Sequence, residues 1–142
     1  MRRRRIDIGG NQMNILQYIS PKSDVTYIGD RMCIPTAMQT MRLSGYSAVP
    51  VVGDDGIYKG VVREGDFLWA IEDGRDKDKQ GRSLKVASLL SPERNPAVSV
   101  TAQMDDVIRM ALDQNFVPVV DDRGMFIGIV TRKSVIEHLM KR

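Results

Sequence analysis

Apolar and polar positions follow one succession of patterns twice along the chain. In the first copy, apolar residues recur three and four apart over 34–43, and two mostly apolar stretches follow at 48–52 and 57–62. The recurrence is that of an amphipathic helix, and short apolar stretches are typical of buried strands. The same helix and strands return at 104–112, 117–120 and 125–130. The pattern therefore predicts an α/β fold built from two similar repeats.

Each copy is completed by segments on either side. A short apolar segment comes first and ends at Ser-Pro, where proline disfavours a helical conformation in the residue before it. A β-prone stretch follows, and a second helix closes the copy. In the two copies these segments are 15–19 and 86–90, 25–28 and 97–100, and 64–71 and 132–140. The predicted order of elements is thus β-α-β-β-α, twice.

The two copies also match residue by residue. Shifting the chain by 68 residues lays 50–62 over 118–130 without a gap, and seven of the thirteen positions are identical. Both hairpins turn through an acidic tetrapeptide that ends in Gly56 or Gly124, and glycine accepts the positive φ of such turns. The match identifies an internal repeat.

The repeats set the expected domain organisation. It consists of a basic leader at 1–12 that we expect to be disordered, repeat 1 at 13–73, a linker at 74–82 and repeat 2 at 83–142. The linker is rich in charged, amide and glycine residues, as a solvated connection is. One repeat of about 60 residues would bury little surface alone, so we expect the two to pack around a pseudo-two-fold axis.

The excess positive charge lies in the leader. The 142 residues include 21 basic and 18 acidic ones, for a net charge of +3. Arg2–Arg5 and Asp7 belong to the leader, so the rest of the chain carries 17 residues of each sign. An arginine run can bind phosphate backbones without sequence specificity, but neither interleaved aromatics nor a recognition helix accompanies it. Nucleic-acid binding through the leader is therefore a minor hypothesis. Met13, where the first apolar-periodic segment begins, is an alternative start of the chain.

Composition narrows the class of protein further. Cys33 is the only cysteine, so we expect neither an internal disulfide nor a cysteine-rich metal site. No apolar run approaches the roughly 18 residues that span a bilayer, and the leader is not followed by the apolar stretch of a signal peptide. We therefore expect a cytoplasmic protein that does not enter a membrane.

No constellation of residues indicates catalysis. Cys33 and His138 fall at the start of the first helix and in the last helix. The aspartate pairs lie at hairpin tips, which are poor places for a site that excludes water, and no phosphate-binding glycine loop is present. We expect no enzyme activity, metal or cofactor, and we interpret His138 as a surface histidine.

The segments FVPVVDDRGMFIGIVTRKSVIEHL (116–139) and GYSAVPVVGDDGIYKGVVREGDFLW (45–69) closely resemble the repeat of cystathionine-β-synthase-type (CBS) domains. The resemblance covers 13–142 and implies tandem CBS repeats, which form a Bateman module with two clefts. Members of this family bind AMP, ADP, ATP, S-adenosylmethionine or a cyclic dinucleotide there. The chain also resembles small stand-alone bacterial CBS pairs that bind cyclic-di-AMP.

Carried over position by position, the resemblance implies a first cleft that ends on Thr131. One repeat would supply adenine contacts, and the other would supply phosphate contacts from the start of its last helix. Exposed N–H groups and the positive helix end attract anions there, and Arg132 and Lys133 add full charges. The implied residues are Val25, Thr26, Tyr27, Tyr46, Ser47, Ala48, Thr131, Arg132, Lys133 and Ser134.

Ser134 departs from the family pattern, because it stands where the family has the aspartate that binds the ribose diol. A mononucleotide would lose this partner, whereas a ligand held through its phosphates would lose less. The departure favours cyclic-di-AMP over AMP, ADP or ATP. A structural interpretation stays open, since Thr131 is a favoured helix cap and Arg132 and Lys133 are common solvated charges.

The implied second cleft has the opposite composition. Asp66 occupies the ribose-binding position, but Arg63 stands at the threonine position, and Glu64 would repel a phosphate. Both acidic residues are also favourable in the first turn of any helix. The implied residues are Arg63, Asp66, Ala97, Val98, Asn115 and Phe116. We expect this cleft to be the weaker phosphate site.

Two functions of different classes follow from the resemblance. In the first, a bound adenine nucleotide alters the surface that a protein partner recognises, because the ligand favours one of two shapes. In the second, the repeats bind no ligand and only dimerise or dock on an enzyme. CBS pairs usually form homodimers through exposed helices. The interface candidates are Met38, Met41, Leu68, Trp69 and Ile136.

Overall fold

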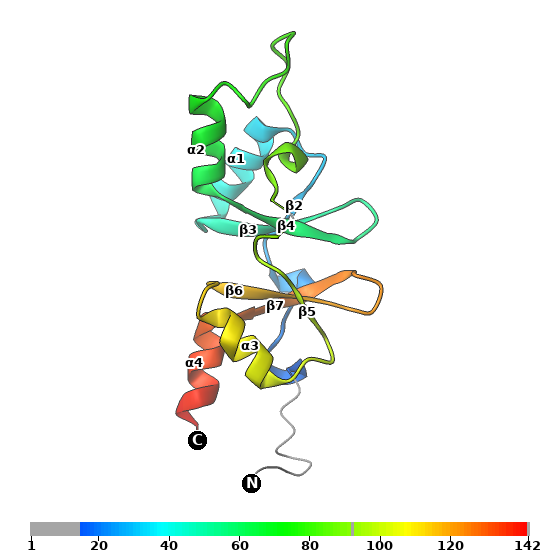
Figure 1. Cartoon of the computed structure of the whole chain (residues 1–142), viewed down its shortest axis with the longest axis vertical. Helices are drawn as coiled ribbons and strands as arrows, with labels where there is room; N and C mark the ends of the chain where they lie inside the picture. The colour runs from blue at the N-terminus through cyan, green and yellow to red at the C-terminus, as the bar shows by residue number, and fades with distance from the viewer. Residues whose placement is uncertain (1–14, 92, 142) are drawn as a thin grey trace. The chain divides into compact units, whose positions relative to one another are not determined.

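The computed structural model describes residues 15–91 and 93–141, and Figure 1 labels its α-helices and the strands β2 to β7. The leader expected at 1–12 lies outside the described residues. The chain divides into two compact units. We call 26–96 with 124–126 the central unit, and 15–25, 97–123 and 127–141 the terminal unit.

The central unit contains a three-stranded sheet in the order β2-β3-β4. β2 (Ile28–Gly29) runs parallel to β3 (Ala48–Val52), which pairs antiparallel with β4 (Tyr58–Arg63). The hairpin therefore forms where the sequence predicts it, whereas the β-prone stretch before the first helix contributes a strand of only two residues.

Two helices complete this unit and lie together on one side of its sheet in Figure 1. α1 (Ile34–Ser44) and α2 (Glu64–Glu72) match the predicted helices to within one residue at each end. α1 ends where Gly45 adopts a φ of 78°, a left-handed conformation that glycine accepts without strain. The core contains Ile28, Ile34, Ala37, Met41, Val49, Val51, Val62, Phe67 and Val86.

The terminal unit contains a four-stranded sheet in the order β1-β7-β6-β5. Its strands are β1 (Ser20–Pro21), β5 (Val98–Ser99), β6 (Phe116–Val120) and β7 (Phe126–Thr131), whose first residue, Phe126, groups with the central unit. Its helices are α3 (Met104–Ala111) and α4 (Arg132–Met140), with short 3-10 helices η2 (Leu16–Tyr18) and η3 (Lys22–Asp24) near the start. The core contains Ile15, Val98, Met104, Val107, Ala111, Val117, Val119, Val130 and Val135.

The short apolar segment that opens each repeat packs in the unit formed mainly by the other repeat. Ile15 is fully buried in the core of the terminal unit, and Val86, on the 3-10 helix η4 (Val86–Leu89), is fully buried in that of the central unit. β1 lies so close to β7 that a Cβ on Gly128 would clash with the carbonyl oxygen of Ser20. The compact units therefore group residues by contact, whereas the expected boundaries group them by sequence.

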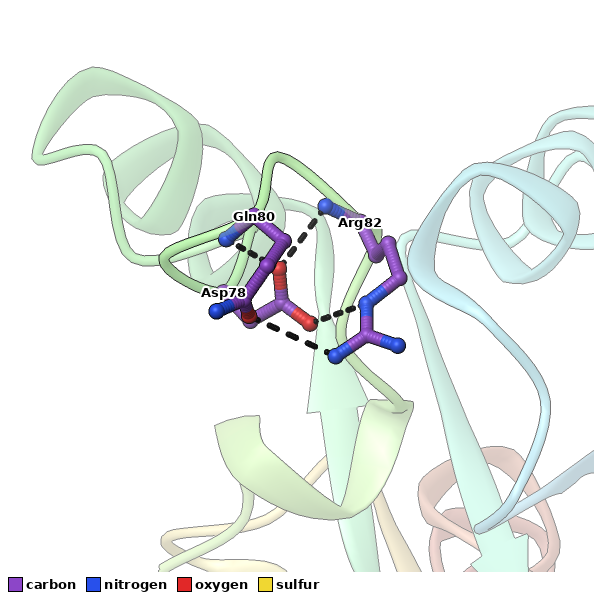
Figure 2. A network of polar contacts seen from close by, with 3 residues as sticks. All are labelled: Asp78, Gln80 and Arg82. Atoms are coloured by element: carbon purple, nitrogen blue, oxygen red, sulfur yellow. Dashed lines mark hydrogen bonds and ion pairs between the residues drawn. The ribbon is translucent and has the colours of Figure 1, made fainter.

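The stretch expected as a linker forms a loop held by its own polar contacts (Figure 2). The carboxylate of Asp78 accepts hydrogen bonds from the backbone N–H groups of Gln80 and Arg82, both at 2.9 Å, and from Nε of Arg82 at 2.8 Å. The Arg82 backbone bond is the largest cause that holds the pKa of Asp78 below its ordinary value. No helix among the described residues is long and apolar enough to cross a membrane.

Candidate functional site

The side-chain hydroxyls of Thr131 and Ser134 contact each other at the start of α4. Thr131 has extended backbone angles, and its Oγ1 accepts a hydrogen bond from the N–H of Ser134 at 3.1 Å. The same hydroxyl donates to Oγ of Ser134 at 3.0 Å. Thr131 therefore caps the helix, and the two side chains that the resemblance assigns to phosphate and ribose contact each other.

Arg132 points its guanidinium at the end of α3. Nε donates to the carbonyl oxygen of Ala111 at 2.9 Å, and Nη2 donates to that of Gln114 at 3.1 Å. A cation satisfies carbonyls left without partners at a helix C-terminus and complements its negative end. Arg132 thus has a structural role that the sequence does not show, while Lys133 is exposed in the first turn of α4.

The start of α2 carries a denser polar cluster. Oδ2 of Asp66 accepts a hydrogen bond from the backbone N–H of Arg63 at 2.8 Å and another from Nη2 of Arg94 at 2.7 Å. Nη2 of Arg63 donates to Oδ1 of Asn95 at 2.8 Å. Arg63 and Asp66 are the residues of the implied second cleft that lie at the start of α2, and we call them its half-site. Both are already paired within the central unit.

Asn95 and Tyr58 extend this polar cluster through hydrogen bonds. Asn95 is 7% exposed and has a φ of 59°, which asparagine tolerates better than most residues. The hydroxyl of Tyr58 donates to the carbonyl oxygen of Asn95 at 2.6 Å, and burial raises the pKa of this phenol. Sequence reasoning missed Tyr58, Arg94 and Asn95. Arg94 and Asn95 lie outside the matched segments, and Tyr58 lies in one but is aligned with Phe126, which has no hydroxyl.

Both units place the residue before their central strand beside the start of their last helix. In the central unit the N–H of Glu64 donates to the carbonyl oxygen of Ser47 at 3.0 Å, and Ala48 pairs with Arg63. In the terminal unit the N–H of Arg132 donates to the carbonyl oxygen of Asn115 at 2.9 Å. The structure therefore brings Ser47 and Ala48 next to Arg63, and Asn115 next to Arg132.

Three aromatic rings gather in the central unit. The ring of Tyr27, 39% exposed, lies 6.0 Å from that of Phe126, and Tyr58 stacks on Phe126 at 6.3 Å with an interplanar angle of 25°. Tyr27 is thus a partly exposed ring with a buried aromatic base. Tyr46 is 60% exposed and lines a groove between α1 and α2.

The residues of each implied cleft are divided between the two compact units. For the first cleft, the central unit holds Thr26, Tyr27, Tyr46, Ser47 and Ala48, and the terminal unit holds Val25, Thr131, Arg132, Lys133 and Ser134. For the second cleft, the central unit holds Arg63 and Asp66, and the terminal unit holds Ala97, Val98, Asn115 and Phe116.

An apolar groove of about 650 Å³ runs between α1 and α2. Leu68 and Trp69 of α2 are 59% and 60% exposed, and Met38 of α1 contributes a partly exposed side chain. Met41, also an interface candidate, is only 3% exposed and belongs to the core. Ile136, the candidate on α4, is 49% exposed.

The reactive side chains have ordinary structural partners. Nδ1 of His138 is hydrogen-bonded to the Tyr18 hydroxyl at 2.8 Å, and Sγ of Cys33 to Oγ1 of Thr36 at 3.2 Å. Within residues 15–91 and 93–141, no group of three or more His, Cys, Asp or Glu side chains is placed to hold a metal ion.

Comparisons with known proteins agree on one family. The family model of the CBS domain matches residues 19–73 and 86–141. A CBS domain-containing protein of Dictyostelium discoideum is 26% identical over 118 residues, which span 76% of this chain and 79% of that protein.

Solved structures share the fold over nearly the whole chain. CbpB in complex with c-di-AMP matches with a TM-score of 0.82 at 22% identity, covering 92% of this chain and 86% of that one. CBSX2 in complex with AMP, a protein of Arabidopsis thaliana, matches with a TM-score of 0.74 at 21% identity, covering 91% and 97%. The tandem CBS fold implied by the sequence resemblance is therefore confirmed.

Proposed function

The chain belongs to the CBS domain family, and we propose that it is a non-catalytic regulatory protein that binds an adenine-containing nucleotide and signals to a protein partner. Cyclic-di-AMP is the favoured ligand, followed by AMP, ADP or ATP. We further propose that the protein acts in the cytoplasm as a homodimer.

One observation carries this proposal. Two proteins that share the fold over about nine-tenths of this chain hold adenine nucleotides, namely c-di-AMP in CbpB and AMP in CBSX2. The common chemistry of these ligands is an adenine ring attached to a ribose phosphate. We therefore propose a ligand that contains this adenine ribose phosphate group.

The preference for cyclic-di-AMP is supported by the start of α4. Ser134 offers a neutral hydroxyl where a carboxylate would grip a ribose diol, and that hydroxyl already accepts a hydrogen bond from Thr131. Lys133 is exposed beside it and supplies a full positive charge for a phosphate. This helix start thus favours a ligand held through phosphate over one held through ribose.

Thermal unfolding with a panel of nucleotides tests the proposal. Cyclic-di-AMP, AMP, ADP, ATP and S-adenosylmethionine are added singly, with cyclic-di-GMP as the control for the base. A ligand at about 100 times its dissociation constant adds about 2.7 kcal/mol to the free energy of unfolding, so binding raises the melting temperature. If no adenine ligand raises it, the nucleotide proposal is wrong.

A pair of substitutions at α4 tests the ligand preference by calorimetry. Lys133→Ala should weaken cyclic-di-AMP binding without lowering the melting temperature, because the side chain is exposed. Ser134→Asp should strengthen AMP binding relative to cyclic-di-AMP, because it restores a carboxylate for the diol. If Ser134→Asp leaves that ratio unchanged, the assignment of this helix start to the ribose phosphate is wrong.

The apolar groove supports the second candidate function, a ligand-free dimerisation or interaction module. Leu68 and Ile71 line it and are 59% and 46% exposed, and exposed apolar patches of this kind mark interaction sites. Light scattering after size exclusion should give a dimer for the wild type and a monomer for Leu68→Glu. Lys79→Glu, in an exposed loop, is the control and should stay dimeric; a monomeric wild type would contradict the homodimer.

A further inference from the structure

The carboxylate of Asp66 has one oxygen fully committed. Oδ2 accepts from the N–H of Arg63 at 2.8 Å and from Nη2 of Arg94 at 2.7 Å. The side chains of Asp66 and Arg94 are 16% and 32% exposed, so the ion pair is partly shielded from water. A charge-assisted hydrogen bond of this length in partly buried surroundings is a strong one.

Arg94 is held in position from several elements. Its Nη2 also lies 3.4 Å from the carbonyl oxygen of Val61 in β4. The next residue, Asn95, is bound through its side chain by Arg63 and through its carbonyl by Tyr58. The turn that carries Arg94 is therefore fixed to β4 and to the start of α2.

Ligands that contain ribose differ in what they offer a carboxylate. AMP, ADP, ATP and S-adenosylmethionine present a free 2′,3′-diol, whose two hydroxyls donate to the two oxygens of one carboxylate. A 3′,5′-cyclic dinucleotide has its 3′ oxygens esterified to phosphate and presents no diol. A carboxylate with one oxygen bound by an arginine is thus a poor partner for a ligand with a free diol. It does not weaken the binding of a cyclic dinucleotide, which has no diol to place there.

We propose that Arg94 is a specificity-determining residue that withholds Asp66 from the ribose diol, so that this half-site selects against nucleotides with a free 2′,3′-diol. This inference rests on the proposed function and adds a residue to it. The Asp66 position would otherwise favour a mononucleotide. Arg94 makes the two helix starts of the chain alike, because neither then offers an unpaired carboxylate to ribose.

Calorimetric titration with AMP and with 2′-deoxy-AMP tests the inference, since the two differ only in the hydroxyl that completes the diol. The wild type should bind them with affinities within about threefold of each other. Arg94→Ala should favour AMP over 2′-deoxy-AMP by about tenfold, as expected for a hydrogen bond to a charged group. The double variant Arg94→Ala/Asp66→Asn should return the ratio to the wild-type value.

Two further variants guard against an effect of folding. Arg94→Gln keeps most of the side chain but removes its charge, and it should shift the ratio in the same direction. Arg75→Ala removes an exposed arginine paired with Asp73 in the same unit at 3.2 Å, and its ratio should equal that of the wild type. Circular dichroism checks that each variant is folded.

The remaining outcomes overturn specific statements. A tenfold preference for AMP in the wild type would mean that Asp66 already reaches the diol. An unchanged ratio in folded Arg94→Ala and Arg94→Gln would mean that Arg94 does not withhold the carboxylate. Equal loss of AMP, 2′-deoxy-AMP and cyclic-di-AMP would make Arg94 a phosphate ligand instead. If no adenine nucleotide binds the wild type or Arg94→Ala, the proposed function is wrong, and so is this inference, which rests on it.

Discussion

The guanidinium of Arg132 lies against the carbonyl oxygen of Ala111, with Nε 2.9 Å from it, and so joins the first residue of α4 to the last residue of α3. The sequence interpretation assigned Arg132 to phosphate, and that assignment stays a prediction. The structure adds a second role, because the same side chain also binds Gln114.

We predict that Arg132→Ala lowers the free energy of unfolding by about 1–2 kcal/mol, because it removes two hydrogen bonds from a charged donor to helix-end carbonyls. Denaturant unfolding measures the change. Lys133→Ala is the matched control and should stay within about 0.5 kcal/mol of the wild type, since its side chain is exposed. Equal stability of the two variants would contradict the structural role of Arg132.

The Thr131 hydroxyl should contribute to stability as a helix cap. Thr131→Ala removes the acceptor of the Ser134 N–H and should cost about 1 kcal/mol, whereas Thr131→Ser keeps the hydroxyl and should cost less. Thermal unfolding without ligand compares the two. If they are equally destabilised, the methyl group rather than the cap is responsible.

Gly128 should be required for the docking of β1. An added Cβ would clash with the carbonyl oxygen of Ser20, so Gly128→Ala must displace the strand and should cost about 1–3 kcal/mol. Gly65→Ala is the control, because its Cβ would lie 3.9 Å from the ring of Trp69, an ordinary contact. Hydrogen exchange should show increased exchange at 15–21 in the first variant alone.

The thiol of Cys33 should ionise more readily than an ordinary cysteine. The hydrogen bond from the side chain of Thr36 is the largest cause that lowers the pKa of Cys33. A lowered pKa leaves more thiolate at a given pH, so Thr36→Val should move the alkylation rate profile with iodoacetamide to higher pH. An unmoved profile would show that the hydroxyl does not stabilise the thiolate.

Much of the fold could be predicted because local patterns in the sequence indicate its helices and hairpins. The 3.6-residue recurrence in 34–43 predicts α1, and the match of 50–62 to 118–130 predicts two equivalent hairpins. These features depend on neighbours in sequence, which share a helix face or a strand. The packing of Ile15 in the terminal unit was not predictable in this way, because any buried apolar surface would satisfy its side chain.

The candidate site was predictable only in part. The resemblance selects Arg63, Asp66 and Thr131 by motif position, but it says nothing of the partners that these side chains find. Arg94 lies 28 residues from Asp66 in the sequence, and their pairing at 2.7 Å depends on a turn with the positive φ of Asn95. Only tertiary contacts bring such residues together.

The sequence by itself determined the double repeat, the order of its elements and the types of residue at the start of each last helix. The tertiary structure decided how those residues are used, so that Arg132 binds the carbonyls of α3 and Asp66 is held by Arg94. The physical reason is the distance along the sequence over which the two kinds of interaction act. Helix and strand patterns arise from interactions over a few residues, whereas a charged side chain pairs with whatever partner the folded chain places within hydrogen-bond distance.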